Sequence, residues 1–156
     1  MAQEKICLVV VGSEAETRAA LHYAHKLAER MGGVVGLFGV AEEPQAMYWL
    51  AVQDASMEER KEKLEQHMSA LSHAFQKGEG KTPIVYLREG RLDTCLAQFL
   101  DEESRVAALV LGPRLGAGHM AASLVADTYE KRKKKTAIPV IMIPSDMKQQ
   151  DIDMMV

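Results

Sequence analysis

The stretch ICLVVVGSEAETRAALHYAHKLAERM, residues 6–31, decides the fold of this chain. Its first part, Ile6–Val11, is continuously apolar and rich in β-branched residues, which is typical of a strand covered on both faces. A Gly-Ser turn follows, and apolar side chains then recur at helical spacing as far as Met31. This order predicts a strand that leads through a tight turn into a helix, the repeating unit of a parallel α/β sheet.

Residues that mark the beginnings and ends of helices agree with this interpretation. Ser13 followed by Glu16 is a capping box, in which the hydroxyl accepts a backbone N–H of the first turn and the carboxylate accepts the N–H of the cap residue. We therefore interpret Ser13 as a helix cap and not as a nucleophile, since the second glycine of a nucleophile elbow is missing. Left-handed glycines that end the first two helices are expected at Gly32, Gly33, Gly78 and Gly80.

Strand and helix patterns alternate along the rest of the chain. Four more apolar runs have the strand pattern: Val34–Val40, Ile84–Leu87, Val106–Leu111 and Ile138–Ile143. Between these runs, two sets of apolar residues recur at helical spacing: Leu64, Met68, Leu71 and Phe75, then Leu92, Leu96, Phe99 and Leu100. The alternation predicts a parallel sheet with right-handed crossovers, in one domain over residues 1–144. We expect the polar tail, residues 145–156, to be disordered.

Composition excludes several classes of protein. With 156 residues, 47% of them hydrophobic, the chain is one ordinary globular domain. A net charge of -3 gives no general electrostatic case for nucleic acid, and no apolar run approaches the ~20 residues of a membrane helix. Cys7 and Cys95 do not make a disulfide framework, so buried, unreactive thiols are expected. We expect a cytoplasmic protein that binds neither nucleic acid nor membranes.

A second glycine-containing turn, GPRLGAGHMAAS at residues 112–123, follows the run Val106–Leu111. Its glycines let backbone N–H groups approach an anion, Arg114 offers two parallel N–H donors, and a helix start follows. The same glycines would also serve an ordinary tight turn, which leaves ligand binding open. Because parallel strands end at one edge of the sheet, we expect a carboxyl-edge crevice lined by Gly12, Ser13, Val40, Gly112, Arg114, Gly116, Gly118 and Ser123.

Other reactive side chains form no catalytic or metal-binding pattern. His22 and His25 lie three residues apart and His67 and His73 six apart, and neither pair brackets a glutamate at metal-site spacing. We see no paired carboxylates for acid–base chemistry, so no catalytic residue and no metal site are predicted.

Two segments leave alternatives open. The basic run Lys131–Lys135 either forms a patch for an anionic partner or, as we favour, complements the negative end of the preceding helix dipole. The long connection Ala41–Ala55, which contains Tyr48 and Trp49, has the length of a lid or binding loop.

These segments together resemble the universal stress protein family over nearly the whole chain. The first strand and helix, VYLREGRLDTCLAQFLDEESRVAALVLGPR (residues 85–114) and IPVIMIP (residues 138–144) carry the resemblance. It implies an α/β fold with an open five-stranded parallel sheet in the order 3-2-1-4-5 and four flanking helices, similar to the adenine-nucleotide alpha hydrolases. Members of the family are usually dimers.

The nucleotide motif that the resemblance implies is degraded here. ATP-binding members usually carry an aspartate where this chain has Val11. In those members two residues separate the first two glycines of the loop, whereas three residues separate Gly112 and Gly116 here. Nine residues after Gly116 the motif expects Gly-Ser or Gly-Thr, but the chain has Ala126 and Asp127, a carboxylate that would repel a triphosphate.

Because the chain resembles this family and no set of catalytic residues is predicted, we favour a non-enzymatic, stress-associated regulatory or binding protein. One alternative is a member that binds ATP or another adenine nucleotide and at most hydrolyses ATP weakly. Another is an interaction scaffold whose crevice is closed by Tyr48 and Trp49.

The terminal strand predicts a homodimer. In the implied strand order it lies at an edge, where an apolar strand needs cover, and Pro139 and Pro144 limit pairing to a short, closed ladder. We expect contacts through Ile138, Val140, Ile141, Met142 and Ile143.

Overall fold

The five apolar runs form one parallel sheet in the computed structural model, which describes residues 4–42, 56–79, 81–115, 120–134 and 137–156. The strand order is β3-β2-β1-β4-β5, which confirms the expected topology. The strands are β1 (Ile6–Val10), β2 (Val34–Ala41), β3 (Ile84–Glu89), β4 (Val106–Leu111) and β5 (Val140–Met142).

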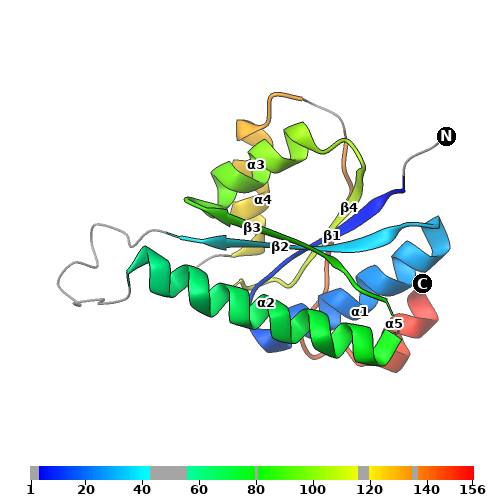
Figure 1. The fold of residues 1–156 in the computed structure, drawn as a ribbon. Coiled ribbons are helices and arrows are strands. Elements are labelled where there is room, and N and C mark those ends of the chain that lie inside the picture. Colours follow the sequence, from blue (N-terminus) through cyan, green and yellow to red (C-terminus); the bar gives the residue numbers. More distant parts are fainter. Residues whose placement is uncertain (1–3, 43–55, 80, 116–119, 135–136) are drawn as a thin grey trace.

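Helices cover both faces of this sheet (Figure 1). They are α1 (Glu14–Met31), α2 (Met57–Glu79), α3 (Leu92–Glu102), α4 (Ala121–Lys131) and α5 (Gln149–Met155). α3 and α4 lie on one face, and α1, α2 and α5 lie on the other (Figure 1). No helix in the described ranges has the length and apolar character needed to cross a membrane.

The expectation of a disordered tail is wrong, because α5 lies within residues 145–156. Its Ile152 is fully buried in the apolar cluster on the α1 face, which also contains Ile143 and Val110. A single buried side chain in a polar segment gives no periodicity, which is why the sequence did not predict this helix.

The central strand explains the continuous apolar pattern of its sequence. Ile6, Leu8 and Val10 pack on the side of α3 and α4, whereas Cys7 and Val9 pack on the side of α1. All five residues of β1 are at most 1% exposed. A strand with both faces buried has no position for a polar residue.

Helix α1 begins and ends at the predicted residues. The Glu16 N–H donates to the Ser13 hydroxyl at 3.4 Å, and Gly32 ends the helix with φ 68°. Helix α2 differs, because it continues through Gly78 to Glu79. Gly78 therefore does not end it, and Gly80 lies outside the described residues.

Candidate functional site

Strand ends bring the expected crevice residues to one edge of the sheet. Gly12 and Ser13 follow β1, Val40 lies near the end of β2, and Gly112 follows β4. Since β1 pairs with both β2 and β4, these residues meet at the carboxyl edge. Arg114 and Ser123 are exposed in the segment that follows β4 and in the first turn of α4. The predicted Gly116 and Gly118 lie outside the described residues.

The backbone of Gly12 is occupied by side chains of the protein itself. Its N–H donates to the Thr17 hydroxyl at 2.9 Å, and its carbonyl oxygen accepts a hydrogen bond from His67 Nε2 at 2.9 Å. Leu115 packs over the same residue, because a Cβ on Gly12 would lie 3.2 Å from Leu115 Cα. The first expected N–H donor for an anion is therefore already bonded.

Glu16 occupies the space beside the second glycine. A Cβ on Gly112 would lie 2.2 Å from Glu16 Oε2, so only glycine leaves room for this carboxylate. Oε2 is buried and has no hydrogen-bond partner. Only the Ser13 half of the predicted capping box is present among the hydrogen bonds of the described residues, because the carboxylate lies against β4. A negative side chain thus stands at the turn where the sequence predicted a bound anion.

Two further helix starts at this edge have internal acceptors. The Leu92 N–H at the start of α3 donates to Glu42 Oε1 at 2.9 Å. The Ala121 N–H at the start of α4 donates to the Pro113 carbonyl oxygen at 2.9 Å. These N–H groups are the ones that bind phosphates in open α/β folds, and here the chain itself supplies the acceptors.

The charge at this edge comes from a different residue than expected. Asp127 is exposed, six residues beyond the start of α4, about 9 Å along the helix axis. Asp127 therefore lies away from the start of α4, and its effect on a bound nucleotide stays a prediction. Glu16 and Glu42 are two acidic groups at the carboxyl edge, and their charges oppose a polyphosphate in the same space.

Two of the hollows on the described surface are bordered by residues outside the expected crevice. One is bordered by Met68, Ser72 and Val85, between α2 and β3. Another lies between α1 and α5. Neither includes a residue of the expected crevice.

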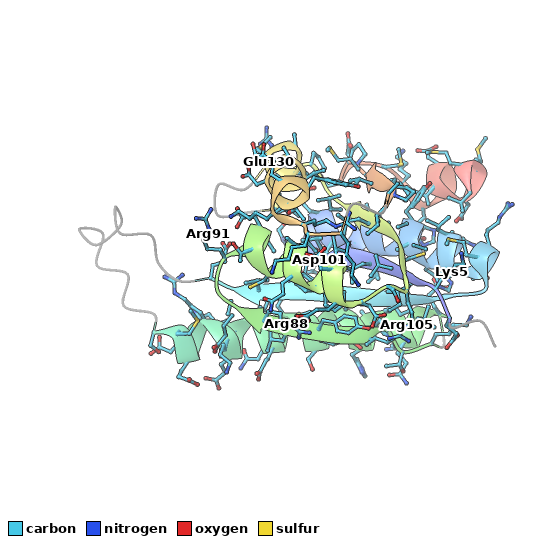
Figure 2. The ribbon with its side chains drawn as sticks, turned by 90° about the horizontal axis from the view of Figure 1, so that it is seen from above. Lys5, Arg88, Arg91, Asp101, Arg105 and Glu130 are labelled. Carbon is cyan, nitrogen blue, oxygen red and sulfur yellow. The ribbon has the colours of Figure 1, made fainter. Side chains whose placement is uncertain are left out.

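The basic run after α4 is held by acids of α3. Lys131 Nζ lies 2.8 Å from Asp93 Oδ2, and the buried Arg132 lies 3.9 Å from Asp101. Asp101 also accepts the backbone N–H groups of residues 133 and 134 at 2.9 and 3.0 Å, and Figure 2 shows it between α3 and this segment. The basic run lies at the end of helix α4, as expected. Its first two residues, Lys131 and Arg132, also lie close to the carboxylates of α3.

The spacing of the histidines in the sequence places them in pairs, but in the structure His22 and His25 contact carboxylates and His67 contacts a backbone carbonyl. His22 Nε2 lies 2.8 Å from Asp153 of α5. His25 Nε2 lies 2.7 Å from Glu29 and 2.8 Å from Glu79. Among these contacts, only that of His25 with Glu29 could be predicted from the sequence, because the two residues lie four apart on one helix.

Of the two cysteines that were expected to be buried, Cys7 is buried and Cys95 is only partly buried. Burial raises the pKa of Cys7 to about 11, so the nucleophilic thiolate is scarce at neutral pH. Burial also raises the pKa of Cys95, whose thiol donates to the Glu89 carbonyl oxygen at 3.4 Å.

Comparison with known families settles what kind of domain this is. The family described as "Universal stress protein family" matches residues 4–144. The chain belongs to the universal stress protein family. Solved structures agree: universal stress protein UspA from Lactobacillus plantarum is 15% identical with a TM-score of 0.65, over 92% of this chain and 99% of that chain.

Two of the matching structures are complexes with a nucleotide. The universal stress protein from Archaeoglobus fulgidus in complex with dAMP is 24% identical with a TM-score of 0.56, over 92% of this chain and 99% of that one. A universal stress protein in complex with cAMP is 16% identical with a TM-score of 0.56, over 90% and 98% of the two chains. No curated protein sequence matches this chain. At these identities the likeness shows a shared fold.

Proposed function

We propose that this universal stress protein is a non-catalytic regulatory binding protein whose carboxyl-edge crevice is closed by its own side chains. The observation that supports this is the position of the Glu16 carboxylate against Gly112, at the strand end where a phosphate would bind. The bonded Gly12 and the internal acceptors at the starts of α3 and α4 support the same proposal. The described residues contain no nucleophile with an adjacent base at this edge.

Binding of ATP or another adenine nucleotide is the second candidate function. It is favoured by the relatives solved with dAMP and cAMP, and by the arrangement of Gly112, Arg114 and Ser123 after β4. To bind there, a nucleotide would have to displace Glu16 from Gly112 and Leu115 from Gly12. We rank it second because the Glu16 carboxylate opposes a polyphosphate, and because moving the buried Leu115 off Gly12 exposes apolar surface.

We further propose that the protein works in the cytoplasm as a homodimer through the edge of β5. Its free cysteines fit a reducing compartment. The predicted contact set changes, because Ile138 and Ile143 are 8% and 2% exposed and their side chains belong to the monomer core. Val140, Ile141 and the 44% exposed Met142 remain for the partner.

Mass spectrometry of small molecules released by denaturing the purified protein tests the proposal. We expect no adenine nucleotide in stoichiometric amount, because the crevice is filled from within. A nucleotide-binding member of the family, purified and denatured in the same way, is the positive control. An equimolar adenine nucleotide released from this chain would contradict the proposal and support the second candidate.

A further inference from the structure

Three ligating side chains converge at the edge of the sheet opposite the expected crevice. His25 and Glu29 lie one turn apart on α1, and Glu79 is the last residue of α2. His25 Nε2 lies 2.7 Å from Glu29 Oε1 and 2.8 Å from Glu79 Oε2, and the three ligating atoms all lie within 4.8 Å of one another. The beginnings of β2 and β3 border this place, so it belongs to the amino edge.

The burial of this histidine makes the cluster unusual. His25 is 5% exposed, and its ring packs edge-on against Phe75 with the centroids 5.3 Å apart. Its Nε2 carries at most one hydrogen, so two carboxylates compete for a single donor. Two negative charges directed at one nitrogen need a positive charge between them.

We propose that His25 Nε2, Glu29 Oε1 and Glu79 Oε2 bind a divalent transition metal ion, with Zn²⁺ as the fitting species. One imidazole nitrogen and two carboxylate oxygens form a donor set that suits zinc, and the two carboxylate charges balance the ion. The metal takes the place of the Nε2 hydrogen. That proton moves to Nδ1 of a neutral ring, or leaves for solvent when the ring begins as imidazolium.

The geometry requires only a small opening of the cluster. Zinc bonds of about 2.0–2.1 Å in a tetrahedron separate ligand atoms by about 3.3 Å, some 0.5 Å more than the present nitrogen–oxygen distances. The side chains of Glu29 and Glu79 are 49% and 33% exposed, so both can rotate outward while the buried ring stays fixed.

Space for a fourth ligand lies next to the three residues. A cavity of about 30 Å³ is bordered by His25, Glu29, Lys81 and Thr82, which is room for a water molecule. Lys81 is the one cation among those bordering residues, and it is exposed, so its ammonium can turn to solvent when the metal binds.

Bound metal would join α1 to the end of α2. Helix α2 buries only Met68, Leu71 and Phe75 among its described residues, so its terminal turn gains most from an added link. Metal that binds the folded chain and not the unfolded one raises the melting temperature.

Calorimetric titration of the metal-free full chain with ZnCl₂ tests the site. We expect one zinc per chain, a raised melting temperature, and at least a tenfold loss of affinity in both His25→Gln and Glu79→Gln. His22→Gln is the matched control, because His22 lies one turn earlier on the same helix and contacts a single aspartate. It should bind zinc as the wild type does.

Circular dichroism shows which variants fold. Because His25 is buried, Glu79→Gln, with its partly exposed side chain, keeps the test decisive if His25→Gln unfolds. Absence of one-to-one binding, or equal affinity in wild type and Glu79→Gln, would overturn the proposal. Loss of affinity in His22→Gln alone would also overturn it.

Discussion

Asp93 shows how a single carboxylate connects two helices of this fold. Its side chain is 9% exposed and lies 2.8 Å from Lys131 Nζ of α4 and 3.1 Å from Arg91, which Figure 2 shows beside the start of α3. Burial raises the pKa of Asp93, but hydrogen bonds from Lys131 and from the Thr94 N–H, with the charges of Lys131 and Arg91, lower it to about 2. The charged form is therefore the one that the folded state stabilises.

We predict that Asp93→Asn lowers the free energy of unfolding by about 2 kcal/mol at pH 7. The folded-state pKa lies below the unfolded value, so this stabilisation is complete well above pH 4 and is lost as the pH falls through about 4 towards 2. Urea unfolding at pH 7 and pH 3 measures it, and the difference between wild type and variant should fall to about half at pH 3.

The exposed Asp127 on α4 provides the control for this pH dependence. Asp127→Asn should change the free energy of unfolding by less than about 0.5 kcal/mol at either pH. A constant difference between wild type and Asp93→Asn from pH 7 to pH 3 would show that the ion pair is not its cause.

Helix α5 is the element whose contribution to stability is least expected from the sequence. Ile152 is fully buried against the α1 side of the core, and Arg30 of α1 donates to the Val156 carbonyl oxygen at 2.7 Å. Asp153 adds its contact with His22. A short polar helix is thus attached to α1 by one apolar side chain and by polar contacts on either side of it.

We predict that Ile152→Ala lowers the free energy of unfolding by about 2–4 kcal/mol, because it removes a fully buried side chain and leaves a cavity. Met154→Ala, at an 86% exposed position of the same helix, should change it by less than about 0.5 kcal/mol. Chemical denaturation of both variants checks this, and similar values for the two would mean that α5 is not packed on α1 in solution.

Elements with local signals could be predicted from the sequence. The continuous apolar character of β1 predicts burial on both faces, and Ser13 and Gly32 mark the ends of α1. Helix α5 was missed because Ile152 alone gives no period. Proline at 139 and 144 borders a strand that is shorter than the apolar run Ile138–Ile143.

The chemistry of the carboxyl edge was less predictable than its location. The sequence places Gly12 and Gly112 at neighbouring strand ends, since parallel strands finish together. Contacts that close this edge are non-local: Glu16 of α1 lies against Gly112 after β4, and His67 of α2 contacts Gly12 after β1. A capping box predicts where helix α1 begins, but packing decides the direction in which the Glu16 carboxylate points.

Both outer strands of the sheet, β3 and β5, expose apolar side chains. At the β5 edge Met142 is 44% exposed, and at the β3 edge Val85 is 45% exposed. Edges of this kind pair with another chain or need cover. We propose that β5 carries the dimer contact, since only a short ladder with its two-fold mate is open to it.

We predict that light scattering after size exclusion gives twice the monomer mass for the wild type at tens of micromolar. Met142→Glu should shift this mass towards the monomer, because it places a charge in the proposed contact. Val85→Glu is the matched control at the opposite edge and should remain dimeric. A monomeric wild type, or dissociation by Val85→Glu and not by Met142→Glu, would contradict the proposed interface.

Calorimetric titration with Mg-ATP tests the central claim, a carboxyl edge closed by Glu16 and Leu115, most directly. The closed edge predicts no saturable binding below about 1 mM, because a polyphosphate would meet the Glu16 carboxylate and because the Gly12 N–H already donates to Thr17. Stoichiometric binding with a micromolar dissociation constant would contradict it.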